Sequence, residues 1–506
     1  MIARIGRRGV VSGALAFGAA ALLPWRTRAS TAMGFDEARH LLARTGFGTT
    51  PAELQMFQAL DYTAAVDRLL GKFRPLAATA PPAWVDEAPQ PRLQQTQPDA
   101  DKDKAGAETR AQAQQDAQRR RQEQGRELSN WWVEEMLTTD QPLVERMTLF
   151  WHNHFTSSIQ KVRYVPAMYR QNALFRREAF GNFATLLREV ARDPAMLIYL
   201  DGVRSVARQP NENFARELLE LFTLGEGRYS EADIKNAARA FTGWSIDRET
   251  GRFVNRTQSH DDGEKVFLGQ TGRFGGDDIL NILLAQPRTA ETVVEKLWRE
   301  FVSMKPDPSE VKRLAGLFRS GGYEMKPLLR ALFLSSAFRD AANRASLIKS
   351  PVDLIVGTVR VLGLPVAEKT QLVRMMGGLG QLPFNPPNVK GWPGGESWIT
   401  SHTLLLRQQY LRRIVEATTV SAMEGGNMMA PAPNRRMERR EQMPVEGRSL
   451  RNAGNAARLG PSLSGVDGDT LRRTLLPRAP IDSVEAGDAP GAIVAAALLD
   501  AAYQLK

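Results

Sequence analysis

Two of the chain's five histidines, His152 and His154, lie two residues apart in the apolar stretch LFWHNHF. A third, His260, precedes Asp261 in the segment SHDDGEK, whose composition is typical of a turn. Imidazole nitrogens and carboxylate oxygens together suit zinc, manganese or iron. The candidate ligands of a divalent metal ion are therefore His152, His154, His260 and Asp261. There are three alternatives. One of His152 and His154 caps backbone carbonyls while the other packs, the pair acts in acid–base catalysis, or Asp261 stabilises a turn.

The spacing of the two neighbouring histidines restricts such a site. On a helix, residues i and i+2 point about 200° apart, so both can face one ion only on a strand or at a frayed helix end. Residues 147–155 have a helical pattern, and the Thr-Ser-Ser that follows indicates that the helix ends there. We expect the pair at a helix C-terminus, where the helix dipole favours a protonated imidazole.

A second group of candidates lies in NENFARELLELFTLG, residues 211–225. Helical spacing places the apolar residues on one broad face and Arg216 on the charged face opposite. Glu217 falls at the edge of the apolar face near Asn213, where a partly desolvated carboxylate needs an arginine, a histidine or a metal as its partner. The candidate catalytic residues are Asn213, Arg216, Glu217 and, from a later helix, Arg407. A purely structural pairing of Glu217 with an arginine is the alternative.

A third feature is the loop LPFNPPNVKGWPGGESW, residues 382–398, which we refer to as the tryptophan loop. Long loops of such specific composition are costly to order and are frequently functional. The candidate substrate-binding residues are Asn388, Trp392 and Trp398, with the two indoles as a stacking floor for a sugar or another planar ligand. Alternatively, the indoles fill the core beneath the loop.

The elements that must position these residues are mainly helical. Apolar residues recur at helical spacing through most of residues 33–74 and 128–423. One interruption, at about residues 252–270, has an Asp-Gly turn between two short extended runs and predicts a β-hairpin.

Two segments have almost no core-forming residues, namely 75–127 and 424–488. We expect both to be low-complexity insertions, with a solvated helix in the second half of the first one. Residues 489–506 have the composition of a closing helix. The sequence thus predicts a mainly α protein, built as one large multi-helix domain with a short β-hairpin and two low-complexity insertions.

The first 32 residues have the composition of an export signal. Arg7 and Arg8 precede an apolar run at residues 10–23, and small residues follow. A membrane-spanning helix needs about 20 apolar residues, so this run predicts a cleaved signal with no stable membrane span afterwards. The arginine pair is typical of twin-arginine export of folded proteins, which predicts a periplasmic or secreted location.

Composition also excludes several kinds of function. The chain has no cysteine, which excludes disulfides, thiol nucleophiles and cysteine-ligated zinc. Its net charge of +11 includes five arginines of the first 30 residues, and the remaining excess does not form a basic patch with aromatic residues. We therefore expect no nucleic-acid partner.

Five segments, in order, resemble the signature blocks of a bacterial family, the domain of unknown function 1800 family. They are HLLARTGFG, ERMTLFWHNHF, NENFARELLELFTLG, HDDGEKVFLG and PPNVKGWPGGESWI. The resemblance implies a large, mostly helical and mostly exported protein. It also implies a possible partner, an exported protein of the domain of unknown function 1501 family. It carries no catalytic role, because the family has no established activity.

Two hypotheses of different classes follow. The first is a periplasmic, metal-assisted hydrolase in which Glu217 acts as acid or base beside the metal. The second is a non-catalytic binding or assembly scaffold for a co-exported partner, which predicts that the same polar residues form a satisfied core, that Glu217 pairs with an arginine, and that no open cleft exists. Carbohydrate binding by the tryptophan loop is a third, weaker idea.

Overall fold

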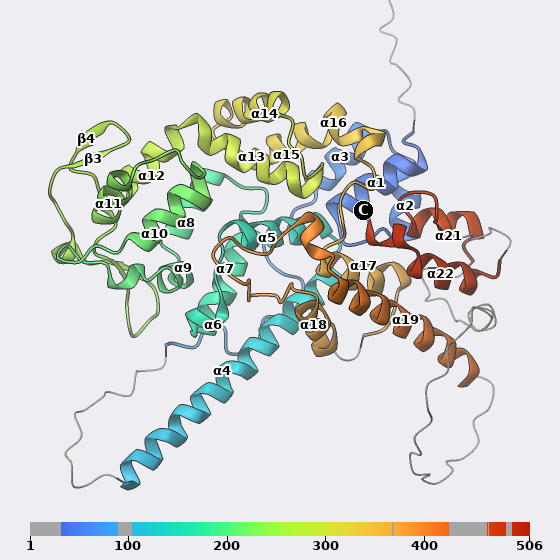
Figure 1. Ribbon diagram of the computed structural model, residues 1–506, viewed down its shortest axis with the longest axis horizontal. Helices are drawn as coiled ribbons and strands as arrows, with labels where there is room; N and C mark the ends of the chain where they lie inside the picture. The colour runs from blue at the N-terminus through green and yellow to red at the C-terminus, as the bar shows by residue number, and fades with distance from the viewer. Residues whose placement is uncertain (1–31, 90–103, 367–368, 425–462, 464, 482–487) are drawn as a thin grey trace, which may run out of the picture.

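The computed structural model describes residues 32–89, 104–366, 369–424, 463, 465–481 and 488–506. Within these residues, helices dominate, and two small antiparallel sheets contain all the strands (Figure 1). The predicted mainly α class is confirmed. The predicted signal peptide, residues 1–32, lies outside the described residues except for its last position.

The helices of the first half begin mostly where the sequence supplies a capping side chain or a proline. Asp61, Asn182 and Asp193, for example, each accept a backbone N–H at the start of a helix. These helices are α1 (Phe35–Thr45), α2 (Pro51–Gln58), α3 (Tyr62–Gly71), α4 (Lys104–Thr138), α5 (Pro142–His154), α6 (Ile159–Val162), α7 (Val165–Arg177), α8 (Phe183–Ala191) and α9 (Pro194–Tyr199).

The segment expected as one helix over residues 211–225 has two parts. After the short 3-10 helix η1 (Gly202–Arg204), α10 (Glu212–Glu217) continues as a π-helix, η2 (Leu218–Thr223). The wider turn is visible in the bonds from Leu224 N to the Leu219 carbonyl and from Thr223 Oγ1 to the Leu218 carbonyl. π-Helical turns are rare and frequently mark functional sites.

The second half returns to regular helices. They are α11 (Glu231–Ala240), α12 (Gly276–Ala285), α13 (Pro287–Phe301), α14 (Pro308–Ser320), α15 (Met325–Phe333), α16 (Ser336–Arg339), α17 (Pro351–Leu362), α18 (Lys369–Gly378), α19 (Ser401–Glu424), α21 (Gly468–Leu475) and α22 (Pro490–Leu499). Two of them, α13 and α17, contact α5. Short 3-10 turns are η3 (Thr257–Ser259), η4 (Ala341–Asn343), η5 (Gly395–Trp398) and η7 (Ala501–Gln504).

The strands form two hairpins where the sequence predicts one. β1 (Trp244–Ile246) pairs with β2 (Phe253–Asn255), and β3 (Lys265–Phe267) pairs with β4 (Gln270–Gly272). The Asp-Gly dipeptide at 262–263 precedes β3 and is not a hairpin turn. The turn between β3 and β4 is Leu268-Gly269, and both residues have positive φ, as a two-residue hairpin turn requires. Asp233 of α11 accepts the Leu268 N–H at 2.8 Å, which holds a leucine in this unfavourable conformation.

Both predicted insertions contain described structure. In the first, the side chain of Trp84 is buried and donates to Glu127 of α4, which extends over residues 104–138. In the second, α21 packs against α22. The closing helix ends at Leu499, and the chain then runs as η7 to Lys506. Residues 90–103 and 425–462 lie outside the described residues.

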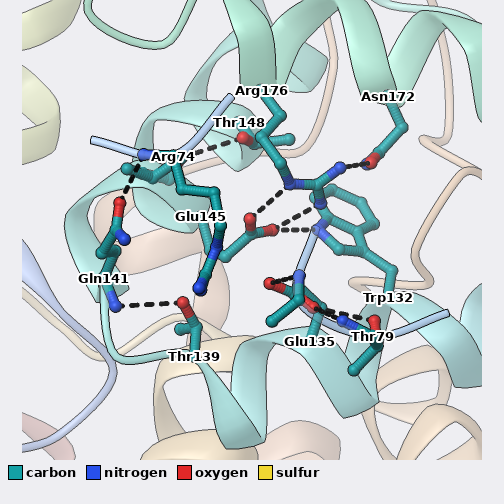
Figure 2. Close-up of polar contacts among 12 residues, drawn as sticks. Arg74, Thr79, Trp132, Glu135, Thr139, Gln141, Glu145, Thr148, Asn172 and Arg176 are labelled. Atoms are coloured by element: carbon teal, nitrogen blue, oxygen red, sulfur yellow. Dashed lines mark hydrogen bonds and ion pairs between the residues drawn. The ribbon is translucent and has the colours of Figure 1, made fainter. Parts of the chain in front are cut away.

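Helix α5 lies at the centre of the molecule (Figure 1). Almost all its residues are buried, including charged ones, because it is surrounded by neighbouring helices. Glu145 accepts two hydrogen bonds from Arg176 of α7, at 2.6 and 2.8 Å, and one from Trp132 Nε1 at 2.9 Å (Figure 2). None of the described helices is sufficiently long and apolar to cross a membrane.

Candidate functional site

A cavity of about 310 Å³ lies between α5, α13, the start of α17, the tryptophan loop and the end of the chain. Seven charged side chains line it, of which five are cationic, and we refer to it as the cationic cavity. The charged lining residues are Arg146, Lys296, Arg299, Lys390, Lys506, Glu300 and Asp353. His154, Trp392 and Trp398 complete the part of the wall that the sequence predicts.

Two of these cations, Arg146 and Lys506, form ion pairs with the two carboxylates along one wall of the cavity. Asp353 pairs with Arg146 and, at 2.7 Å, with Lys506 Nζ, and Arg146 also contacts Glu300 at 3.1 Å. The two cations hold the pKa of the Asp353 carboxyl below its usual value despite its burial. This network anchors the end of the chain to α5 and α17.

Of the remaining three cations, Lys390 has a close carboxylate partner, whereas the two cations of α13 have none among the described residues. Lys390 Nζ lies 2.8 Å from Glu226 and 3.8 Å from Glu220, both outside the cavity. Arg299 has only a distant contact, 3.9 Å, with Glu295. Lys296 has no ion pair within the described part of the chain. The cationic cavity therefore has an excess of positive charge on the α13 side.

The π-helix positions Lys296. Its Nζ donates to the Leu221 carbonyl at 2.7 Å and to His154 Nδ1 at 3.0 Å. The Leu221 carbonyl is in the last turn of η2, where a helix leaves its carbonyls without helical partners. Burial, with a smaller effect of Arg299, lowers the pKa of Lys296 to about 8.

His152 and His154 lie on opposite sides of α5, because the helix extends through both of them. His152 packs against Trp132, Phe175 and Phe384, and its Nε2 lies 3.1 Å from the Asn172 amide. That amide belongs to the Glu145–Arg176 network in Figure 2.

Burial disfavours the protonated form of both imidazoles. Burial lowers the pKa of His152 to about 3 and holds that of His154 well below its usual value. The expected protonation by the helix dipole is therefore wrong, because desolvation outweighs it.

The other two predicted ligands lie elsewhere. His260 Nδ1 is 3.0 Å from the Thr242 carbonyl, and Asp261 forms an ion pair with Arg239 at 2.7 Å. Over the residues that the structure covers, no three His, Asp or Glu side chains are grouped so that they could hold a metal ion. The predicted four-ligand set of His152, His154, His260 and Asp261 is thus not assembled, since the first two lie on opposite sides of α5 and the last two are held at the end of α11.

The predicted catalytic residues of α10 have different partners. Arg216 pairs with Glu231 at the surface, at 2.8 Å, and the exposed Asn213 contacts Asp201 at 3.4 Å. Glu217 is partly buried, and burial together with the charge of Glu220 raises its pKa. The charge of Lys390 acts on it in the opposite sense, so Glu217 lies close to the tryptophan loop.

The last catalytic candidate and one candidate ligand-binding residue have structural contacts. Arg407 is fully buried and donates to the Gln504 side chain at 3.1 Å and to the Lys349 carbonyl at 2.9 Å, outside the cationic cavity. Asn388 is exposed, and its side chain accepts the Lys390 N–H at 2.9 Å within the loop.

The two tryptophans do line the cationic cavity, but as a wall. Trp392 is 4% exposed and Trp398 is 5% exposed, so most of each ring packs into the core. Asn153 Oδ1 accepts the Trp392 N–H at 2.6 Å and joins the loop to α5. The structure therefore agrees with the prediction that both tryptophans line a cavity. It does not agree with the prediction of an open stacking floor, because little of either ring is exposed.

The close approach of the loop to α5 requires glycine at position 391. Gly391 has φ +87°, and a Cβ there would lie 2.8 Å from the Asn153 carbonyl oxygen and closer still to its side chain. We expect Gly391→Ala to lower the free energy of unfolding by about 3 kcal/mol, from backbone strain plus overpacking. Denaturant titration measures this loss of stability.

Gly227→Ala, with φ +74° and open space around it, is the matched control and should cost about 1 kcal/mol. Equal losses would contradict the close-approach argument.

Sequence reasoning missed Arg146, Lys296, Arg299, Asp353 and Lys506. The sequence of α13 contained one indication of the site. Thr289, Thr292 and Lys296 stand at i, i+3 and i+7 among apolar residues, and both threonines are buried in the structure. A polar stripe on a buried helix face indicates a polar site. No local pattern shows that the chain's end meets Asp353.

A family model described as "Protein of unknown function (DUF1800)" matches residues 40–504. The chain belongs to this family. The match includes every element of the cationic cavity except Lys506. Neither a curated protein nor a solved structure matches the chain.

Proposed function

We propose that this DUF1800 protein binds a small organic anion in the cationic cavity. The observation that supports the proposal most directly is the pair Lys296 and Arg299. These two cations of α13 line the cavity, and neither is hydrogen-bonded to a carboxylate within the described residues. Lys296 is partly buried without an ion pair in the part of the chain that the structure describes, which is unfavourable unless an anion completes the site, and the 43% exposed Arg299 can add a second contact to that anion.

The size and the walls of the cationic cavity define the class of ligand. A volume of about 310 Å³ is at the lower end for ligand sites, so the ligand is a small molecule. Phe150, Trp392 and Trp398 add apolar surface to the lining of the cavity. A carboxylate or phosphate on a small apolar or cyclic body has the matching distribution of charge and apolar surface.

The structure bears differently on the two hypotheses from the sequence, the metal-assisted hydrolase and the scaffold. A metal-assisted hydrolase with the predicted ligand set has no assembled site to support it. The scaffold hypothesis is supported by the buried, hydrogen-bonded positions of His152 and Arg407. It also requires that no open cleft exists, and the cationic cavity does not meet this requirement. Export by the twin-arginine route and a DUF1501 partner stay predictions; binding of a small anion is compatible with both.

Calorimetric titration with benzoate, at low ionic strength, tests the proposal. Benzamide, a neutral molecule of nearly the same shape, is the matched ligand control. We expect benzoate to bind at one site per chain and benzamide to bind at least tenfold more weakly. Arg299→Gln removes one charge-assisted contact, worth about 1.5–3 kcal/mol, and should weaken benzoate binding tenfold or more.

Arg313→Gln is the control variant for this titration. Arg313 is an exposed arginine of α14 that pairs with Glu310 and does not line the cavity. It should bind benzoate like the parent protein. Equal affinities of the Arg299→Gln and Arg313→Gln variants, or equal binding of benzoate and benzamide, would overturn the proposal.

A further inference from the structure

Lys296 differs from the other cations of the cationic cavity in the partners of its amine. The amines and guanidinium groups of Arg146, Lys390 and Lys506 contact carboxylates within 3.1 Å. Lys296 Nζ contacts two neutral acceptors instead, the Leu221 carbonyl and His154 Nδ1. A carboxylate stabilises the protonated amine, whereas neutral acceptors in a partly buried wall do so much less.

The number of acceptors matches the neutral form of the amine. A neutral amine has two hydrogens and one lone pair, and the two acceptors engage two hydrogens. Burial disfavours protonation of His154, and a protonated Lys296 amine can only donate, so the imidazole accepts at Nδ1 and carries its own proton at Nε2. Loss of the third proton thus leaves both hydrogen bonds intact and frees a lone pair on Nζ.

We propose that Lys296 is a nucleophile that forms an imine with the carbonyl group of an anionic carbonyl compound, such as a 2-oxo acid. This inference rests on the proposed function, because the anionic group is held by the same cavity. Arg299, one helical turn further along α13, is the cation available for the carboxylate of such a ligand.

The chemistry balances without an oxidant or a reductant. The Nζ lone pair attacks the carbonyl carbon, a C–N bond forms, and the C=O π electrons move to oxygen, which takes one of the two nitrogen protons. The resulting carbinolamine loses its hydroxyl group and the remaining nitrogen proton as one water molecule, which leaves a C=N bond. Amines with a lowered pKa in desolvated pockets are the lysines that react in this way, and the pKa of Lys296, about 8, supports the assignment.

Reductive trapping tests the inference. The full-length protein is incubated with pyruvate and cyanoborohydride, and the modified lysines are identified by peptide mass spectrometry. We expect Lys296 to be labelled at least tenfold faster than Lys390, which lines the same cavity but is 62% exposed and pairs with Glu226. Acetone, a carbonyl compound without the anion, should not show this preference, and benzoate should slow the labelling of Lys296.

Two variants complete the design. Lys296→Met should remove the preferred adduct, and Lys390→Met should retain it. Peptide mapping of the parent protein alone decides the matter if Lys296→Met does not fold. Labelling spread over exposed lysines, with Lys296 unmodified, would overturn the inference. If benzoate still binds in that case, the proposed function stands without the imine; if benzoate does not bind, both fail.

Discussion

Acidification from about pH 6 to pH 4 is expected to lower the free energy of unfolding by about 3 kcal/mol per pH unit. Burial lowers the pKa of His40 and of His152 to about 3, and it holds that of His154 well below the usual value. The unfolded chain protonates these three imidazoles below a pKa of about 6.5, whereas the folded chain keeps them neutral.

One buried group acts in the opposite direction. Burial raises the pKa of Asp193 to about 7, so between about pH 4 and pH 7 the folded chain binds a proton that the unfolded chain does not. The unfolded state thus takes up about two more protons than the folded state, and each corresponds to about 1.4 kcal/mol per pH unit. Stability is therefore highest above about pH 6.5 and falls with acid.

Denaturant titrations at half-unit pH steps measure this slope. His152→Gln removes one of the three imidazoles and should reduce the slope by about 1.4 kcal/mol per pH unit. His402 is exposed on α19, so His402→Gln should leave the slope unchanged. A flat profile between pH 6 and pH 4.5, or a parent slope in the His152→Gln variant, would show that the histidines are not buried in neutral form.

Arg176→Met is expected to destabilise the protein by about 4 kcal/mol, because it leaves the Glu145 carboxylate buried without its cation. Glu145 is 1% exposed and Arg176 is 2% exposed, and the pair forms two hydrogen bonds (Figure 2). Trp132 Nε1 would be the remaining donor to the carboxylate. Denaturant titration at neutral pH measures the loss.

The neighbouring residue supplies the control. Arg177 pairs with Glu189, but both side chains are more than 40% exposed, so Arg177→Met should cost less than about 1 kcal/mol. The double variant Glu145→Gln and Arg176→Met should recover part of the loss, because it removes the stranded charge. An Arg176→Met variant as stable as Arg177→Met would show that the network in Figure 2 contributes little.

Local sequence patterns predicted the helices well. The apolar spacing and Gly46 place α1, and the Thr-Ser-Ser after His154 places the end of α5 within a residue. The tryptophan loop was predicted from its proline and glycine content, and two of its candidate residues, Trp392 and Trp398, line the cavity. These features depend on residues that are close in sequence, which is where patterns carry information.

The site itself depends on contacts between distant residues. Lys506 and Asp353 are 153 positions apart, and Asn153 and Trp392 are 239 apart. Nothing in the local sequence of either partner indicates such pairs. The π-helix was also unexpected, because the pattern of residues 211–225 fits an ordinary α-helix; its free carbonyl at Leu221 is what positions Lys296.

The measurement that tests the central claim most directly is a crystal structure with 4-bromobenzoate, with anomalous diffraction locating the bromine. Anion binding in the cationic cavity predicts the strongest bromine peak against the Trp392 and Trp398 wall, with the carboxylate within hydrogen-bonding distance of Arg299 or Lys296. The same soak with Arg299→Gln crystals should give a weaker peak. A cavity without bromine, while bromine peaks occur at surface arginines elsewhere, would contradict the account.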